Sequence, residues 1–347
     1  MNGSEFVYPT TRYSGSKRRS LGFIREHLKG IRFESALDVF GGTATVSLML
    51  KRDGKRVHYN DLLRFNTLIG RALIENSEAL VAESDVDQVL RPARDCPRVI
   101  SRNFSGMYYL DHENEWLDNV AYNLSLFSNR HKQAILMAAL FQACLAKRPF
   151  NLFHRTNLNI RTRNVARTFG NKTTWERPFE ELFRRYVREY NAAVLDNGQA
   201  NKVVGGYDAF QCPNGVDLVY LDPPYYSGSR TEGTNYLVFY HFLEGLADYE
   251  KWEQNMTSRA VNPARRFISH EIEHWSKRSN MYESFKRVIE RFQDNIIVLS
   301  YRDHGIPDSD TIRLLLSVFK KRIEVFSLPT KYALSKSATS EILFVAR

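Results

Sequence analysis

Short apolar segments alternate with amphipathic segments over much of the chain. The apolar segments have the length and the Val, Leu, Ile and Tyr content of buried strands. Strands are predicted at 36–40, 56–59, 217–221 and 295–300. The amphipathic segments repeat their apolar positions with a helical period. Helices are predicted at 20–28, 43–51, 62–75 and 135–147. This alternation is typical of an α/β fold with a mostly parallel sheet.

The end of the chain and its middle depart from this alternation. Residues 323–328 and 341–346 are two further apolar segments, and they predict a terminal antiparallel hairpin. Helical segments continue between residues 78 and 189, but no strand is indicated there. The sequence therefore predicts a sheet domain formed by residues 1–77 and 190–347, interrupted by a mainly helical inserted domain at 78–189.

Charge is distributed unevenly along the chain. Its 347 residues include 49 Lys and Arg against 39 Asp and Glu, a formal net charge of +10. Such an excess favours a polyanionic partner, although many basic proteins have none. Between residues 144 and 188 there are 11 Lys and Arg against 3 Asp and Glu, so most of the excess lies in the predicted insertion. With 43% hydrophobic and 25% charged residues, the composition excludes a mainly disordered chain.

The cysteines and the apolar runs indicate in which cellular compartment the protein resides. Cys96, Cys144 and Cys212 lie far apart and form no Cys-x-x-Cys motif, so we predict packing thiols, with no metal site and no disulfide framework. No apolar run approaches the roughly 18 residues of a membrane span. The N-terminal segment lacks the apolar core of a secretory signal. These features predict an intracellular protein without membrane contact.

A short motif follows the strand at 217–221 directly: Asp222-Pro223-Pro224-Tyr225. Open α/β folds bind ligands at the carboxyl ends of their strands, and two consecutive prolines make a stiff turn. This turn is suited to the exocyclic amine of a nucleobase. The Asp222 carboxylate and the Pro223 carbonyl would accept the amine hydrogens and release the nitrogen lone pair, while Tyr225 would stack on the base. The alternative is a rigid surface turn without a ligand.

Two further features lie at predicted strand ends. The run Asp38-Val39-Phe40-Gly41-Gly42-Thr43 places glycines at a strand-to-helix turn, where bare backbone lets a cofactor approach closely. Asp61 follows the second strand, about 20 residues beyond this turn, which is a position suited to ribose hydroxyls. The alternatives are a tight turn without a ligand and, for Asp61, a helix N-cap.

Together these residues resemble the Dam-like, α-group DNA adenine-N6 methyltransferases. The resemblance rests, in chain order, on Arg12 to Lys17, Asp38 to Thr43, Asn60-Asp61, Asp208, and Asp222 to Tyr225. It implies a Rossmann-like methyltransferase sheet with an inserted DNA-recognition domain. It also implies site-specific methyl transfer from S-adenosyl-L-methionine to the N6 amino group of adenine, by base flipping and direct transfer.

The resemblance implies a set of cofactor-binding residues. These are Tyr13, Lys17, Asp38, Phe40, Gly42, Thr43, Asp61 and Asp208. Tyr13 and Lys17 would border the methionine end of S-adenosyl-L-methionine, Asp61 would hold the ribose, and Asp208 would reach the adenine of the cofactor. The glycine-turn residues would line the pocket between them. The chain departs from the family pattern at Ala44, where a glycine is common.

The resemblance also implies a catalytic motif and a DNA contact surface. Asp222, Pro223, Pro224 and Tyr225 would form the catalytic motif and hold the flipped base. Basic residues of the insertion would contact double-stranded DNA. We predict this role for Lys147, Arg148, Arg155, Arg161, Arg163, Arg167 and Lys172. A solvated basic face is the alternative for these residues.

Other functions stay open at this point. Cytosine-N4 methylation uses the same amine chemistry, although an acidic first residue in the motif resembles the adenine enzymes more. RNA methylation and a catalytically silent DNA-binding protein are further alternatives. The chain has no convincing nuclease motif, so a restriction activity would need a separate cognate endonuclease. The resemblance implies a cytoplasmic enzyme of a prokaryote or phage.

Overall fold

The computed structural model describes residues 8–163, 172–227, 235–257, 273–330 and 339–347. The chain divides into two compact units. The helical unit comprises Met1–Ser16, Leu63–Asp196 and Tyr236–Ile268. The sheet unit comprises Lys17–Leu62, Asn197–Asn235 and Ser269–Arg347. The inserted domain at 78–189 stays a prediction, and the compact unit around those residues also takes in segments before and after them.

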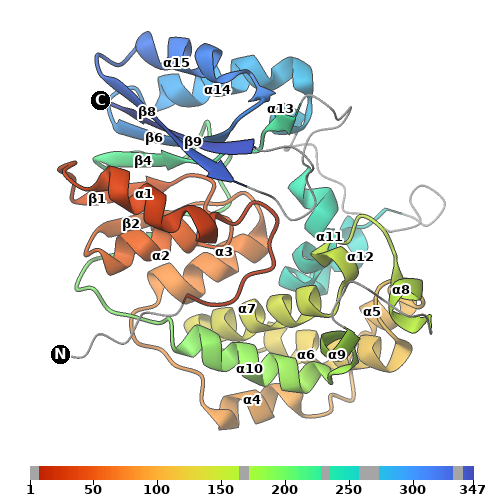
Figure 1. Cartoon of the computed structure of the whole chain (residues 1–347). Helices are drawn as coiled ribbons and strands as arrows, with labels where there is room; N and C mark the ends of the chain where they lie inside the picture. Colours follow the sequence, from red (N-terminus) through yellow and green to blue (C-terminus); the bar gives the residue numbers. More distant parts are fainter. Residues whose placement is uncertain (1–7, 164–171, 228–234, 258–272, 331–338) are drawn as a thin grey trace. The chain divides into compact units, whose positions relative to one another are not determined.

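The sheet unit is built on a seven-stranded sheet in the order β3-β2-β1-β4-β6-β9-β8, among the residues that are described (Figure 1). Its strands are β1 Ser35–Asp38, β2 Arg56–Tyr59, β3 Lys202–Val203, β4 Leu218–Leu221, β6 Ile296–Arg302, β8 Ile323–Thr330 and β9 Thr339–Ala346. The pairs from β3 to β6 are parallel, whereas β9 runs antiparallel to both β6 and β8. This arrangement confirms the predicted mostly parallel sheet with a terminal antiparallel hairpin.

Helices cover both faces of this sheet. They are η1 Lys17–Ser20, α1 Leu21–Leu28, α2 Thr45–Arg52, α13 Glu273–Ser276, η5 Arg278–Asn280, α14 Met281–Arg291 and α15 Ser309–Ser317. Alternate strand residues, such as Leu37, Val219 and Ile297, share one apolar core with α14 and α15. The intervening residues face the opposite side, where Asp38 contacts Ser47 of α2. The central strands β1 and β4 are therefore buried along their whole length, as expected for parallel strands that are covered on both faces.

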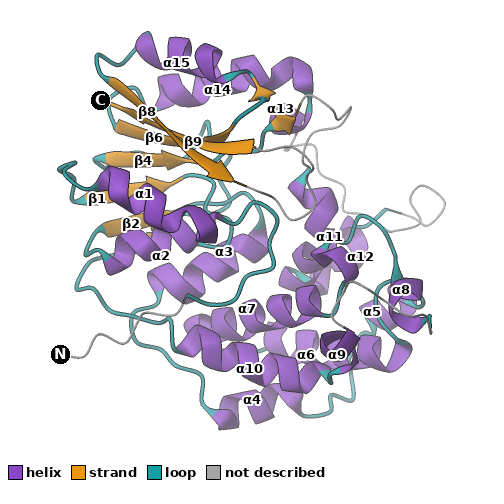
Figure 2. Ribbon diagram, in the orientation of Figure 1, coloured by secondary structure: helices purple, strands orange, loops and turns teal. Residues whose placement is uncertain are grey.

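The helical unit consists of helices and loops wherever it is described (Figure 2). Its elements are α3 Arg64–Gly70, η2 Arg71–Glu75, α4 Glu83–Leu90, α5 Val99–Phe104, α6 Asp111–Ser125, α7 Arg130–Ala146, η3 Pro149–Asn151, α8 Leu158–Thr162, α9 Lys172–Glu176, α10 Phe179–Asn191, α11 Tyr236–Ala247, η4 Tyr249–Lys251 and α12 Trp252–Asn255. Helix α7 is buried on all sides from Ala134 onward and packs against α3, α6, α10 and α11. An apolar helix buried all round is the centre of a helical core.

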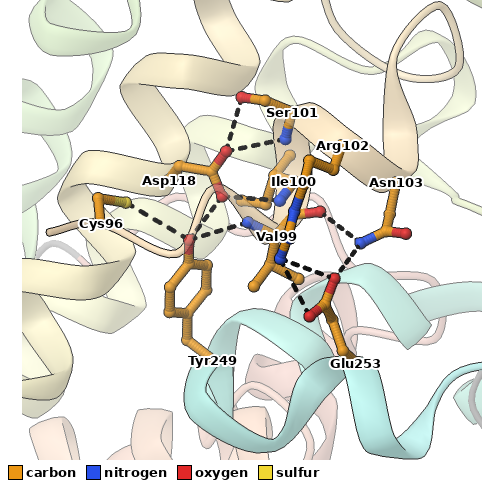
Figure 3. Close-up of polar contacts among 9 residues, drawn as sticks. All are labelled: Cys96, Val99, Ile100, Ser101, Arg102, Asn103, Asp118, Tyr249 and Glu253. Atoms are coloured by element: carbon orange, nitrogen blue, oxygen red, sulfur yellow. Dashed lines mark hydrogen bonds and ion pairs between the residues drawn. The ribbon is translucent and has the colours of Figure 1, made fainter.

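A polar network, buried at Asp118 and Tyr249, ties residues beyond 235 to the helical unit (Figure 3). Asp118 on α6 accepts hydrogen bonds from the backbone N–H of Ile100 at 2.7 Å and from the hydroxyl of Tyr249 at 2.6 Å. Glu253 of α12 accepts one from the Asn103 side chain at 2.8 Å. These bonds join α5 and α6 to the η4–α12 segment, although the two pairs are far apart in the sequence.

The described residues contain neither a membrane-spanning helix nor a candidate metal site. None of their helices combines the length and the apolar character that crossing a membrane requires. Nor do the described residues contain a group of His, Cys, Asp and Glu side chains arranged to hold a metal ion. All three cysteines are free thiols, and Cys144 and Cys212 are buried.

Candidate active site

The sheet topology brings three sequence motifs to one edge. Strand β1 lies between β2 and β4, and all three run in the same direction, with Asp38 paired to both Tyr59 and Tyr220. The turns that follow these strands therefore leave the same edge of the sheet. This register brings together the glycine turn after β1, Asp61 after β2 and Asp222 after β4, as the sequence predicts.

The glycine turn is held by the residues that follow β2. The N–H of Gly41 donates to the Asn60 carbonyl at 2.8 Å, and the N–H of Gly42 donates to the Asp61 carboxylate at 2.9 Å. A Cβ atom on Gly41 would lie 2.1 Å from the Tyr59 ring, so only glycine fits there. Asp61 is not the N-cap of α3, because that position belongs to Leu63. Its carboxylate instead closes the turn.

Asp38 contributes a buried carboxylate with unused hydrogen-bonding capacity. Its side chain is 1% exposed, and one oxygen accepts a 2.6 Å hydrogen bond from Ser47. The other oxygen, Oδ1, has no partner among the described residues. Burial, together with the nearby carboxylates of Asp222 and Asp61, raises the pKa of Asp38 to about 7, although the Ser47 hydrogen bond lowers it. A buried acceptor without a partner is costly, so this oxygen is suited to a ligand that carries a donor.

The loop at 205–208 is tied to the same edge. The Asn60 side-chain amide donates to the carbonyls of Val39 at 2.9 Å and Tyr207 at 3.0 Å, and it accepts from the Tyr207 N–H at 3.2 Å. Asp208 follows in this loop, half-buried, and its carboxylate accepts from the Phe210 N–H at 2.9 Å. Asn60 thus links β1 to the segment that carries Asp208.

Lys17 lies between two carboxylates at the end of β4. Its ammonium nitrogen is 3.0 Å from Asp222 and 2.6 Å from Glu341, and all three side chains are less than one-fifth exposed. Burial and the Glu341 carboxylate raise the pKa of Asp222 and Lys17 lowers it, and the resulting pKa is about 6. The two carboxylates keep the pKa of Lys17 above its ordinary value in spite of burial. Asp222 is therefore a largely ionised acceptor at neutral pH.

The rest of the Asp-Pro-Pro-Tyr motif is anchored by its flanks. Pro223 is buried, whereas Tyr225 is half-buried and meets the Tyr301 ring edge-on, with 6.0 Å between the ring centroids. The next residue, Tyr226, begins β5 (Tyr226–Ser227), which pairs with β7 (Gly305–Ile306). The turn is thus fixed by β4 on one side and by β5 on the other.

The remaining predicted cofactor residues have different surroundings. Phe40 is half-buried and packs edge-on against Trp275 at 5.2 Å. The Thr43 hydroxyl is 2.8 Å from that of Thr45 at the start of α2. Tyr13 belongs to the helical unit, where it stacks on Tyr240 with 4.6 Å between ring centroids. Every predicted cofactor residue except Tyr13 therefore belongs to the sheet unit.

Three of the predicted DNA-contacting residues have internal partners instead. The Lys147 ammonium is 2.7 Å from the Glu113 carboxylate, and Arg161 makes two hydrogen bonds to the same carboxylate, at 2.8 and 2.9 Å. Arg148 is 1% exposed and lies over the rings of Tyr108 and Phe153. Basic composition cannot distinguish a cation with a buried partner from one that faces a phosphate. We therefore assign these three to the support of the loop after α7.

The other members of that set are more accessible. Arg155, Arg163 and Lys172 are exposed, and Lys172 forms a solvent-exposed ion pair with Glu176 at 3.4 Å. Arg167 lies outside the described residues. In the segment that follows α7, Phe150 is 56% exposed and has a positive φ of 63°. The sequence assigns Phe150 no role of its own, although an aromatic residue between Arg148 and Arg155 is a signal for nucleic-acid contact.

Glu341 is the residue of this edge that sequence reasoning missed. It stands near the start of β9, in a strand that is otherwise apolar from Ile342 to Ala346. The Glu341 side chain is only 4% exposed, and acidic residues are rarely buried in this way unless they have a partner. Its partner Lys17 lies near the opposite end of the sequence, so the pair is visible only in the folded chain.

Two comparisons with known proteins show which family this chain resembles in sequence. The family described as D12 class N6 adenine-specific DNA methyltransferase matches residues 13–297. The chain is also similar to the type II methyltransferase M2.HphI of Haemophilus parahaemolyticus, with 26% identity over 351 aligned positions that cover 97% of each chain.

Proposed function

Since this chain belongs to the D12 class of N6 adenine-specific DNA methyltransferases, we propose that the carboxyl edge of its sheet unit binds the methyl donor and the target adenine side by side. The activity is S-adenosyl-L-methionine-dependent methylation of adenine in DNA. Family membership thus decides for adenine over cytosine-N4, and for DNA over RNA. The observation that carries the proposed site is the buried Lys17–Asp222 ion pair at the end of β4.

The residues at the glycine turn fit the methyl donor. Bound S-adenosyl-L-methionine supplies an activated methyl group. The unpaired oxygen of Asp38 would accept a hydrogen bond from a donor on this ligand, and the bare backbone at Gly41 and Gly42 would let it approach closely. Asp61 would face the ribose while it closes the turn, and Asp208 would face the adenine of the cofactor. Lys17 would act mainly through Asp222, because both carboxylates beside it hold its ammonium.

The Asp-Pro-Pro-Tyr motif fits the target base. The Asp222 carboxylate and the Pro223 carbonyl would accept the two amine hydrogens of a flipped adenine, which directs the nitrogen lone pair at the methyl group. The half-buried ring of Tyr225 would stack on the base, a contact worth about 1–3 kcal/mol. Transfer would then be direct, without a covalent enzyme intermediate, and the proton that the methylated nitrogen loses would pass to Asp222 or to water.

The exposed basic residues of the helical unit would hold the DNA. Arg155, Arg163 and Lys172 are suited to phosphates, and the exposed ring of Phe150 is suited to stacking on a base. Arg167 stays in this set as a prediction from sequence. In this proposal residues 78–189 form the target-recognition domain.

The proposed biological context follows from the substrate and from the relative. M2.HphI is called a type II methyltransferase, and we extend that context to this chain. The chain would modify DNA in the cytoplasm of a prokaryotic or phage-infected cell. A separate cognate endonuclease would cut the unmodified site.

A labelled-cofactor experiment tests the proposed residue roles. Duplex DNA is incubated with the full chain and methyl-labelled S-adenosyl-L-methionine, then digested to nucleosides. We expect label in N6-methyladenine for the wild type and none for Asp222→Ala, which should still bind the cofactor in calorimetry. Transfer at the wild-type rate by Asp222→Ala would rule out the proposed role of the motif.

A further inference from the structure

The Glu341 side chain lies on the same face of the sheet as the Asp38 side chain. Side chains alternate between the two faces of a strand, and Ile342 and Phe344 of β9 belong to the apolar core shared with α14 and α15. Glu341 therefore points to the opposite face, the one that also carries Asp38. It is 4% exposed, so its charge is satisfied by protein groups rather than by solvent.

Two groups satisfy that charge, and both are close. The Lys17 ammonium is 2.6 Å from Glu341, a shorter separation than the 3.0 Å to Asp222. The hydroxyl of Ser300 on the neighbouring strand β6 donates to the same Glu341 oxygen at 3.1 Å. One ammonium is thus shared between two carboxylates. Burial of the Lys17, Asp222 and Glu341 charges costs free energy, because all three lose contact with water. Packing alone would be achieved more easily with apolar side chains.

The sharing has a consequence for Asp222. If Lys17 paired with Asp222 alone, its ammonium would compete with the target amine for hydrogen bonds to the Asp222 carboxylate. Glu341 holds Lys17 from the other side and so limits this competition. We propose that Glu341 is a positioning residue for methyl transfer, which acts through Lys17 to keep the Asp222 carboxylate oriented and available to the target amine. This inference rests on the proposed role of Asp222.

The electrostatic surroundings of Asp222 support this role. The groups that influence Asp222 are the Lys17 ammonium, the Glu341 carboxylate, the buried Asp38 and the hydroxyl of Tyr220. Glu341 raises the pKa of Asp222, and Lys17 lowers it. Loss of the Glu341 charge removes its raising effect on the pKa of Asp222. It also leaves the Lys17 ammonium to pair with Asp222 alone, which strengthens the lowering effect of Lys17. The pKa of Asp222 would then fall, and activity would persist to lower pH.

The first test compares Glu341→Gln with Glu324→Gln. Glu324 lies on β8 of the same hairpin and pairs with Arg322 and Arg347, so it is a matched control away from Lys17. The rate constant kcat is measured against pH with duplex DNA and labelled cofactor. In Glu341→Gln we expect kcat at about pH 8 to fall about tenfold and the acid limb of the profile to move to lower pH. Glu324→Gln should match the wild type.

Two results of this test would overturn the inference. One is a wild-type profile in Glu341→Gln. The other is a lower kcat with an unmoved acid limb, since a merely structural role lowers the rate without changing the ionisation of Asp222. Glu341→Asp restores the charge and should recover the wild-type acid limb, with part of the lost rate.

A second readout does not depend on turnover. Carbon-13 carboxyl NMR of the unliganded full chain follows the titration of Asp222, which is assigned with Asp222→Asn. We expect a lower midpoint in Glu341→Gln than in the wild type and no change in Glu324→Gln; an unchanged midpoint in Glu341→Gln refutes the coupling. A wild-type enzyme that transfers no methyl group would instead refute the proposed function, and the NMR result would still decide whether Glu341 controls Asp222.

Discussion

Substitution of Arg148 separates a structural cation from a DNA contact. Its guanidinium donates to three backbone carbonyls of the following loop: Leu152 at 2.9 and 3.1 Å, Arg155 at 2.6 Å and Thr156 at 2.6 Å. It also lies 4.7 Å from the centroid of the Tyr108 ring. Burial lowers the pKa of Arg148 to about 10, so the group remains charged at neutral pH.

These contacts set the size of the expected effect. A hydrogen bond from a charged donor contributes about 1.5–3 kcal/mol, and four bonds that act as one unit do not add fully. We expect Arg148→Met to lower the free energy of unfolding by roughly 3–5 kcal/mol, the range for breaking a buried charged network. Arg148→Lys keeps the charge but cannot donate to three carbonyls at once, so it should lose most of the same stability.

Denaturant unfolding and salt-dependent DNA binding together measure this distinction. Arg155→Gln is the matched control, because its side chain is exposed while its backbone carbonyl is retained. When a residue that contacts one phosphate is replaced, we expect the slope of the logarithm of the DNA-binding constant against the logarithm of the salt concentration to become smaller in magnitude by about 0.9. The free energy of unfolding should not change. Arg155→Gln should show that pattern. If Arg148→Met showed it instead, with stability intact and near-normal binding by Arg148→Lys, the structural assignment would be refuted.

Three further substitutions test the local physical chemistry. Burial raises the pKa of Asp38 to about 7, so the penalty for ionising it is absent below about pH 4 and complete above about pH 7. Asp38→Asn should raise the free energy of unfolding by roughly 2–4 kcal/mol at about pH 8 and leave it unchanged at about pH 4; equal effects in chemical unfolding at both pH values would contradict this. Ala44 has a left-handed φ of 57°, so Ala44→Gly should raise unfolding stability by up to about 1 kcal/mol, and a decrease would exclude strain there. Tyr240→Phe removes the acceptor for the Ser14 N–H, now at 2.7 Å, and should cost about 1 kcal/mol in thermal unfolding; no loss relative to the exposed control Tyr282→Phe would show that this bond contributes nothing.

Much of the fold was predictable because its signals are local. The strands at 36–40, 56–59, 217–221 and 295–300 were confirmed within a few residues, since buried parallel strands are short apolar runs. The two-residue strands β3, β5 and β7 were not predicted. Segments so short carry no periodicity, and they form only because a neighbouring strand presents free backbone groups.

The candidate site was predictable to the extent that it lies at strand ends. The motif at Asp222, the glycine turn and Asp61 each follow a recognisable strand, and parallel pairing brings such ends to one edge. Glu341 was not predictable in this way. It acts across the sheet, from a strand of the terminal hairpin, on a lysine near the other end of the chain.

The basic insertion shows the limit of composition. Charge counting found the segment that holds the excess of Lys and Arg, but it treated Lys147, Arg148 and Arg155 as equivalent. The folded chain separates them: the first two are buried against a carboxylate and backbone carbonyls, and the third is exposed. Sequence composition records how many charges are present, whereas burial decides which of them remain available to a partner.

The sequence by itself determined the class of this protein, the order of its motifs and the amine chemistry that we propose for Asp-Pro-Pro-Tyr, because each depends on residues that are neighbours in the chain. Only the tertiary structure decided which side chains share a charge. The Lys17 ammonium between Asp222 and Glu341, and the unpaired Asp38 oxygen on the same face, depend on strand order and burial. Electrostatic interactions follow distance and solvent exposure in space, and neither quantity is recorded in the linear order of residues.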